Sequence, residues 1–131
     1  MTLPLPGLFA VHDSTTYQVV AVGDDWLNLL VAPGTSLPSS IGQGEDRRGR
    51  TWVKVPKAVL ERYFRVVVTV DWRGEEFGLN RVSGDEAQIL GGSPSVADRL
   101  GLGGDQYNGF HATVPVQELA VVDVQEREID V

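Results

Sequence analysis

Hydrophobic and polar residues alternate along most of this chain with a period of two, which is typical of half-buried β-strands. The clearest run is 66–72, VVVTVDW, where every second residue from Val66 to Trp72 falls on one face. Turns containing glycine separate this run from two further predicted strands, 76–82 and 87–90. The pattern predicts a meander of three antiparallel strands joined by tight turns.

The same pattern occurs twice. Residues 7–30 align without a gap on residues 67–90 when the chain is shifted by sixty positions. Apolar residues coincide in seven pairs: Leu8/Val68, Ala10/Val70, Tyr17/Phe77, Val19/Leu79, Val22/Val82, Leu29/Ile89 and Leu30/Leu90. Each copy then closes with a Val-Pro step, at Val55-Pro56 and at Val114-Pro115. An internal repeat fixes architecture before any local assignment, so we expect two copies of one small β unit.

The segments that follow the third strand differ between the copies. Residues 32–50 are rich in proline, glycine and serine, which predicts a long loop. Residues 93–101 predict a short helix, because Ser93 can cap it, Pro94 suits its first turn and Gly101 can end it. After the first Val-Pro step, the helical turn can extend into a short helix over 57–63.

This succession of elements resembles the SH3-like small barrels. The matching pieces are Tyr17 to Leu30 with Trp52-Val53-Lys54-Val55-Pro56, and Phe77 to Leu90 with Ala112-Thr113-Val114-Pro115. The resemblance implies an all-β protein with short helical turns. It would form two tandem SH3-like small barrels or barrel-like sheets, residues 1–66 and 67–131, packed as one unit. The aromatic cluster that binds proline-rich peptides in SH3 domains is absent, so that activity is not carried over.

A second resemblance is to bacterial immunity proteins that are encoded beside polymorphic toxins. It rests on the acidic composition, on 82–86 (VSGDE) and on 113–119 (TVPVQEL). The resemblance implies a non-catalytic protein-binding module that inhibits a cognate toxin by occluding its active site. The expected partner is therefore a protein, specifically a basic toxin domain.

Composition limits the other possibilities. The chain has 131 residues and no cysteine, which excludes disulfides, thiolate metal sites and thiol nucleophiles. Its N-terminus, MTLPLPGLFA, is a poor signal peptide because proline and glycine interrupt the apolar run. No apolar stretch is long enough to cross a bilayer. We therefore expect a cytoplasmic protein that does not insert into membranes.

The charge is uneven. The formal net charge is −7, but residues 1–65 hold seven basic and six acidic residues while residues 66–131 hold four and twelve. All seven basic residues of the first half lie between Arg47 and Arg65. The net charge argues against general binding to nucleic acid and is compatible with a basic partner or simply with solubility.

No arrangement of residues predicts catalysis. His12 and His111 align with Trp72 and Trp52 of the other copy, which indicates packing positions rather than bases. The acidic pairs lie at predicted turns, where solvated side chains are usual. The glycine-rich segments lack the lysine of a phosphate loop, and no serine lies in a nucleophile motif. We expect no enzyme activity, no cofactor and no metal site.

The candidate partner contacts are acidic residues at turns and aromatic residues beside them. Acidic turns can enter a cationic cleft, and complementary charge speeds encounter. Trp26 aligns with Glu86, so the fold does not require an aromatic there; it is either an anchor or partly buried against the other repeat. The predicted contacts are Asp24, Asp25, Trp26, Glu75, Glu76, Asp105 and Tyr107.

Two other hypotheses remain. Arginines beside an aromatic could bind a nucleic-acid backbone and stack a base, as in a nucleic-acid- or ribosome-associated small barrel. The residues concerned are Arg47, Arg48, Arg50, Trp52 and Lys54. Alternatively, this basic segment pairs with the acidic second half of the chain. A third hypothesis is a scaffold or regulatory subunit of a larger complex.

Overall fold

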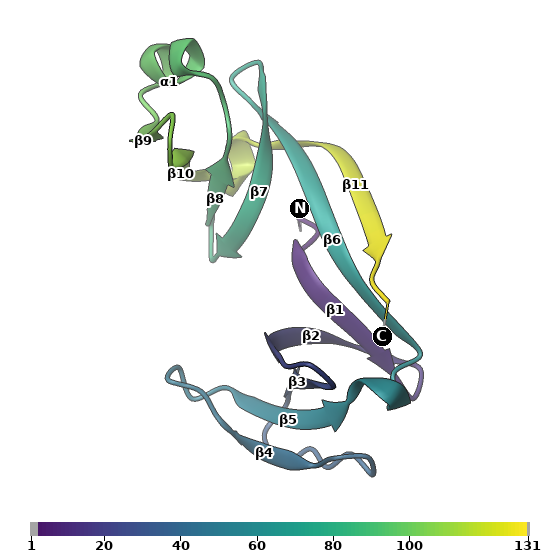
Figure 1. The fold of residues 1–131 in the computed structure, drawn as a ribbon. Helices are drawn as coiled ribbons and strands as arrows, with labels where there is room; N and C mark the ends of the chain where they lie inside the picture. The colour runs from purple at the N-terminus through teal and green to yellow at the C-terminus, as the bar shows by residue number, and fades with distance from the viewer. Residues whose placement is uncertain (1–2, 131) are drawn as a thin grey trace. The chain divides into compact units, whose positions relative to one another are not determined.

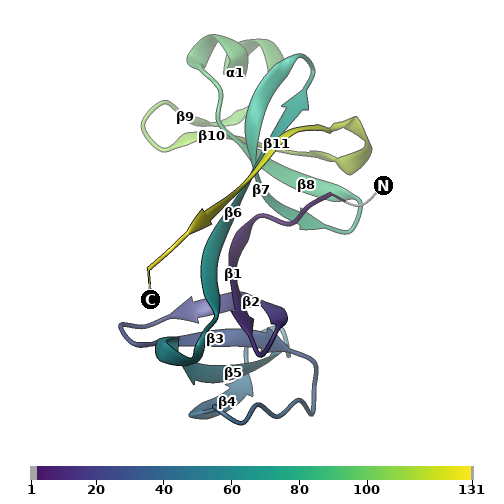
Figure 2. The same cartoon turned by 90° about the vertical axis from the view of Figure 1, so that its right-hand side faces the viewer.

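A computed structural model describes residues 3–130 (Figures 1 and 2). These residues form a mostly β protein, with one antiparallel sheet of eleven strands and one short α-helix. The predicted all-β class with short helical turns is confirmed. The expectation allowed small barrels or barrel-like sheets, and the sheet is not closed into a barrel. Its strand order begins at β4 (Gly42–Glu45) and ends at β9 (Gly103–Asp105), two short glycine-containing strands.

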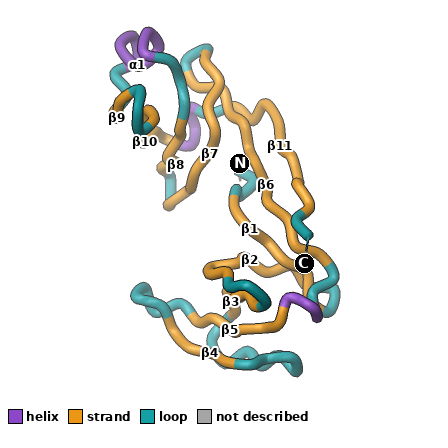
Figure 3. Tube along the Cα trace, in the orientation of Figure 1, coloured by secondary structure: helices purple, strands orange, loops and turns teal. Residues whose placement is uncertain are grey.

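The first copy contains five strands and a single 3-10 turn (Figure 3). The elements are β1 (Gly7–His12), β2 (Thr15–Val22), β3 (Trp26–Val31), β4, β5 (Thr51–Pro56) and η1 (Lys57–Val59). The second copy repeats this series and adds a helix and a closing strand. Its elements are β6 (Arg62–Trp72), β7 (Glu75–Ser83), β8 (Glu86–Leu90), α1 (Pro94–Leu100), β9, β10 (Gly109–Pro115), η2 (Val116–Glu118) and β11 (Ala120–Glu128).

The two copies have the same strand order. The first runs β4-β5-β3-β2-β1 and the second β9-β10-β8-β7-β6. Even an irregularity repeats: the register shifts between Val19 and Ala21 in β2, and between Leu79 and Arg81 in β7. These bulges lie sixty positions apart, so the alignment predicted from the sequence matches the observed pairing.

The first turn of each copy has positive φ at both central residues, as in a type I′ hairpin turn. Asp13 and Ser14 have φ of 50° and 64°, and Arg73 and Gly74 have φ of 53° and 85°. This turn matches the right-handed twist of the strands that it joins. It fixes the registers His12↔Thr15 and Trp72↔Glu75.

Outside the meanders, the structure confirms one local prediction and corrects two. Helix α1 begins after Ser93, whose Oγ accepts from the N–H of Val96 at 3.3 Å, and ends at Gly101 with φ of 71°. The predicted loop 32–50 contains β4, which pairs with β5. The helix allowed over 57–63 is only the turn η1, because β6 already begins at Arg62.

The chain forms two compact units. One contains Gly7–Arg65 and residues 127–130, and its formal net charge is zero; we call it the neutral unit. The other contains Val66–Glu126 and residues 3–6. It has three arginines against ten carboxylates, and we call it the acidic unit. The whole formal charge of −7 therefore belongs to the acidic unit.

Each unit has its own core, built from the buried faces of its strands. In β3, for example, the buried residues alternate with half-buried ones, as the period of two predicts. The core of the neutral unit is Ala10, Val19, Leu27, Leu29, Val31, Val53, Val55, Leu60 and Tyr63. The core of the acidic unit is Leu3, Val68, Val70, Trp72, Phe77, Leu79, Ala87, Ile89, Val114 and Leu119.

Each end of the chain belongs to the unit of the opposite repeat. Leu3 precedes the first copy, yet it is 6% exposed in the core of the acidic unit. Ile129 follows the second copy, yet it packs against the core of the neutral unit, where its N–H donates to the carbonyl of Tyr63 at 2.8 Å. The compact units are therefore not two uninterrupted halves of the chain.

Candidate functional site

The predicted partner contacts fall in both units. Asp24, Asp25 and Trp26 belong to the neutral unit, while Glu75, Glu76, Asp105 and Tyr107 belong to the acidic unit. The five residues of the alternative, nucleic-acid set all belong to the neutral unit, on β5 and on the loop that joins it to β4.

The hairpin of β9 and β10, which we call the tyrosine hairpin, presents one of the most exposed aromatic side chains of the described residues. Tyr107 lies in its loop and is 88% exposed. Asp105 organises this loop, because its Oδ1 accepts the backbone N–H groups of Tyr107 and Asn108, both at 2.8 Å. The bond from the Asn108 backbone is the largest cause that holds the pKa of Asp105 below its usual 3.8. Asp105 is thus a loop-forming residue, and Tyr107 is the side chain that it positions.

A shallow hollow lies beside Tyr107, between α1 and the tyrosine hairpin. Its lining combines apolar side chains with two carboxylates: Pro94, Ala97, Asp98, Leu102, Gly104, Asp105, Gln106, Tyr107 and Phe110. An apolar centre with a charged border is the usual anatomy of a protein-binding patch. Of the predicted acids on β7, Glu76 is exposed, whereas Glu75 accepts a hydrogen bond from Arg99 of α1.

Trp26 is half-buried, and its ring contacts Gly23 and Lys54 of its own repeat. Its indole lies over Gly23, where a Cβ would overlap the ring. The Lys54 ammonium lies 4.1 Å from the ring centroid, a cation–π contact that ties β3 to β5. Asp24 and Asp25 are exposed in the preceding turn. The carbonyl of Asp25 accepts the N–H of Lys57 at 2.9 Å.

The hairpin of β4 and β5, which we call the arginine hairpin, is the counterpart of the tyrosine hairpin. Asp46 lies fifty-nine positions before Asp105, and its Oδ1 accepts the N–H groups of Arg48 and Arg50, both at 2.9 Å. The bond from the Arg50 backbone is the largest cause that lowers the pKa of Asp46. The Arg50 guanidinium also pairs with the second carboxylate oxygen at 2.7 Å.

The two hairpins share a frame and differ at their loops. In each, an aromatic ring of the longer strand lies over a directly paired glycine: Trp52 over Gly44, and His111 over Gly103. A Cβ at these glycines would come within 2.7 Å of Trp52 and 2.8 Å of His111. At the loops, Arg47-Arg48 of one hairpin corresponds to Gln106-Tyr107 of the other. The repeated frame is structural, so the differing loop residues are the better functional candidates.

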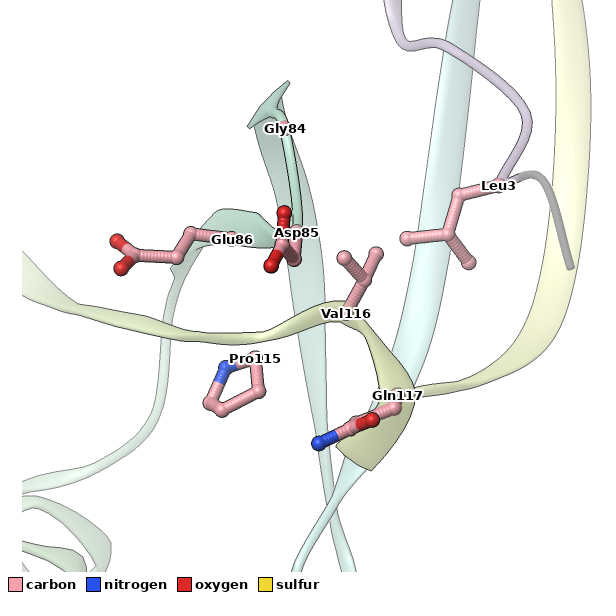
Figure 4. A pocket seen from close by; sticks show the side chains of 7 residues that line it. All are labelled: Leu3, Gly84, Asp85, Glu86, Pro115, Val116 and Gln117. Carbon is pink, nitrogen blue, oxygen red and sulfur yellow. The ribbon is translucent and has the colours of Figure 1, made fainter.

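Another hollow of the acidic unit contains none of the predicted contacts (Figure 4). It has a volume of about 720 Å³ and lies between the segments 84–86 and 115–117. The side chains of Leu3 and Val116 face each other across it (Figure 4), and the N–H of Val116 donates to the carbonyl of Asp85 at 2.8 Å. The equivalent bond in the neutral unit is Lys57 to Asp25, so this contact belongs to the shared fold.

The two histidines differ in their exposure. His12 is 7% exposed, and neither of its ring nitrogens has a hydrogen-bond partner among the described residues. His111 is exposed beside Gly103. Within residues 3–130, no group of three or more His, Asp or Glu side chains could hold a metal ion. No helix in the described part is long and apolar enough to span a bilayer.

Sequence reasoning missed Asn28 of β3. Its Oδ1 is buried and has no hydrogen-bond partner among residues 3–130. The only signal in the sequence is its alignment with Gln88, which does not reveal an unpaired acceptor.

No family model, no curated protein and no solved structure matches this chain.

Proposed function

We propose that this chain is a non-catalytic protein-binding module built from two SH3-like, barrel-like sheets, one for each of the repeats 1–66 and 67–131. In this proposal the acidic unit binds a basic protein through the tyrosine hairpin. The observation that carries the proposal is Tyr107, which is 88% exposed on a loop that Asp105 holds in place. Because the loop is already ordered, binding costs less conformational entropy.

The charge of the acidic unit supports a basic partner. The unit carries a formal charge of −7, and Asp98 and Glu76 are exposed on it. Opposite charge on a partner would raise the association rate, while an aromatic anchor would slow dissociation. A toxin active site that handles anionic substrates has this positive character. We therefore propose an immunity protein whose tyrosine hairpin occludes the active site of a cognate toxin.

The test is a kinetic binding measurement with the purified product of the adjacent reading frame. Tyr107→Ala should weaken the complex by at least about 30-fold, mainly through faster dissociation. Asp98→Lys should instead slow association several-fold, and this effect should shrink in high salt. The matched control is Arg48→Ala, at the equivalent position of the arginine hairpin, which should leave the affinity unchanged.

Two results would contradict the proposal. The adjacent product could fail to bind, or it could bind with an affinity that Tyr107→Ala does not change while circular dichroism shows an intact fold. The occlusion step is tested by adding enough of the Tyr107→Ala variant to saturate the toxin. If the saturated toxin is still inhibited, the tyrosine side chain does not occlude the active site.

A further inference from the structure

A third hollow lies in the neutral unit, on the arginine hairpin and the solvent face of β2 and β3. It has a volume of about 440 Å³, within the range of small-ligand sites. The residues that line it differ in chemistry: Val20, Ala21, Asn28, Asp46, Arg47, Arg48, Arg50 and Trp52. It therefore combines an aromatic ring, cations and an amide.

Trp52 and Arg50 are held in place by their neighbours, whereas Arg47 and Arg48 are exposed. The Trp52 ring rests on Gly44 and is half-buried, so its position is set by the hairpin. Arg50 is held by Asp46. Arg47 and Arg48 are exposed, and no acidic side chain within residues 3–130 pairs with either guanidinium. Two cations are thus available beside a positioned ring.

The amide supplies the most specific feature. Asn28 Oδ1 is buried without a donor among the described residues, a state that costs free energy. The second copy shows how the fold satisfies this position: Gln88 Oε1, sixty residues on, accepts from Asn80 Nδ2 at 2.6 Å. The residue equivalent to Asn80 in the first copy is Val20, which has no donor. The acceptor in the first copy therefore lacks the side-chain donor that its counterpart has in the second copy.

We infer that this hollow binds an unpaired nucleotide of a single-stranded nucleic acid. The base stacks on Trp52, and a shift of the Asn28 side chain, whose Oδ1 is buried in the free chain, brings this acceptor to an N–H group of the base edge. Arg47 and Arg48 bind the phosphate beside it. The formal charge of −7 argued against such a ligand, but all of it belongs to the acidic unit, and three of the eight basic residues of the neutral unit line this hollow.

This site differs by two residues from the nucleic-acid-binding set predicted from the sequence. Lys54 is placed outside the site, because its ammonium lies over the Trp26 ring. Asn28 enters the site in its place. The residues of this hollow all lie in the neutral unit, whereas the tyrosine hairpin lies in the acidic unit, so the two binding sites can be tested separately.

The test is fluorescence anisotropy with labelled homopolymers of about ten nucleotides, a length within the site sizes of small barrels. Trp52→Leu should weaken binding of every homopolymer by about 5- to 100-fold. Arg47→Gln and Arg48→Gln should each lower the slope of log affinity against log salt by about 0.7. Tyr107→Ala, which tests the protein-binding proposal, should have no effect here.

Asn28→Leu separates a ligand role from a structural one. Because it removes an unpartnered buried acceptor, this variant should keep or raise the melting temperature while it loses discrimination among the homopolymers. His111→Leu, at the position equivalent to Trp52, is the matched control and should bind like the parent chain.

Three outcomes would overturn the inference. They are an absence of homopolymer binding at low salt, binding that Trp52→Leu leaves unchanged in a folded chain, and mononucleotides that bind as tightly as the homopolymers. The last result would indicate a site for a free nucleotide rather than for a strand.

Discussion

Asp46 and Asp105 perform the same local task, each accepting main-chain N–H groups of the loop that follows it. A carboxylate is a stronger acceptor than a carboxylic acid, so these bonds favour the ionised form and lower both pKa values. The loops are therefore most ordered when the two aspartates are ionised. The side chains that they position, Arg48 and Tyr107, are the ones that differ.

For Asp105 this predicts an acid-dependent loop. Because the folded-state pKa lies below the ordinary 3.8, the stabilisation is complete above that value and is lost as pH falls through the lower folded pKa. Amide resonances of Tyr107 and Asn108 should shift in this acidic range in NMR spectra. The titration should disappear in Asp105→Ala, and a shift that persisted there would have to come from another group.

His12 and Trp72 occupy equivalent positions with different consequences. Trp72 Nε1 donates to Glu118 Oε1 at 3.0 Å, whereas the position equivalent to Glu118 in the first copy is Val59. His12 is consequently buried, and neither ring nitrogen has a partner within residues 3–130.

Replacing His12 by Phe should therefore raise the free energy of unfolding by about 1 kcal/mol, because it removes buried polar atoms that make no hydrogen bond. Trp72→Phe should lower it by at least about 1 kcal/mol through loss of the bond to Glu118. Urea denaturation measures both. A large loss of stability in His12→Phe would show that the ring nitrogens are satisfied in solution.

How far the sequence predicts these residues depends on the kind of information involved. Asp46 and Asp105 could have been found, because both lie at the same offset as the two Val-Pro steps. The open acceptor of Asn28 could not, since it depends on burial and on the absence of a donor across a bulged strand. For Trp26 the sequence left open an anchoring role and burial against the other repeat, and the contact with Lys54 of the same repeat was predicted by neither.

Among the elements, the hairpins depend on glycine at particular positions. Gly104 has φ of 87°, and a Cβ there would overlap the carbonyl oxygen of Gly109, a backbone atom that cannot move aside easily. Gly109 has φ of 91° but an open surrounding. Both residues have the positive φ that favours glycine, but only at Gly104 would a Cβ also clash with a neighbouring atom.

Gly104→Ala should therefore destabilise the tyrosine hairpin by about 2 kcal/mol or more, and Gly109→Ala by about 1 kcal/mol, the cost of backbone strain alone. Hydrogen exchange of the β10 amides that pair with β9 measures the difference. Equal effects of the two variants would mean that the backbone of the hairpin relaxes around the new methyl group.

The predictability of the elements follows from their local signals. Helix α1 was predictable because its cap, proline and terminal glycine are all encoded within nine residues. Strands β4 and β9 were not, because they consist of residues with low strand propensity and form only by pairing with β5 and β10.

For the whole molecule, the exchanged chain ends make one repeat sensitive to residues next to the other. Leu3→Ala should lower the stability of the acidic unit by about 2–3 kcal/mol, although it lies beside the first repeat. Leu5→Ala is the matched control, since Leu5 is 51% exposed and should contribute little.

The measurement is urea unfolding followed by Trp72 fluorescence in a Trp26→Phe, Trp52→Phe background, because Trp72 then reports on the acidic unit alone. If Leu3→Ala and Leu5→Ala behave alike, the assignment of residues 3–6 to that unit is wrong.

The exchange of ends also bears on how such a chain could arise and whether it could revert. Leu3 and Tyr63 lie sixty positions apart. Leu3 precedes the strands of the first copy but is buried in the acidic unit, and Tyr63 precedes those of the second copy but is buried in the neutral unit. A descendant that deleted one copy would lose a core side chain of the survivor along with it. In a chain that held a single copy, a second molecule could supply that side chain, as in a domain-swapped homodimer. Once two copies were joined in one chain, deletion of either copy would destabilise the other, so the duplication would be difficult to reverse.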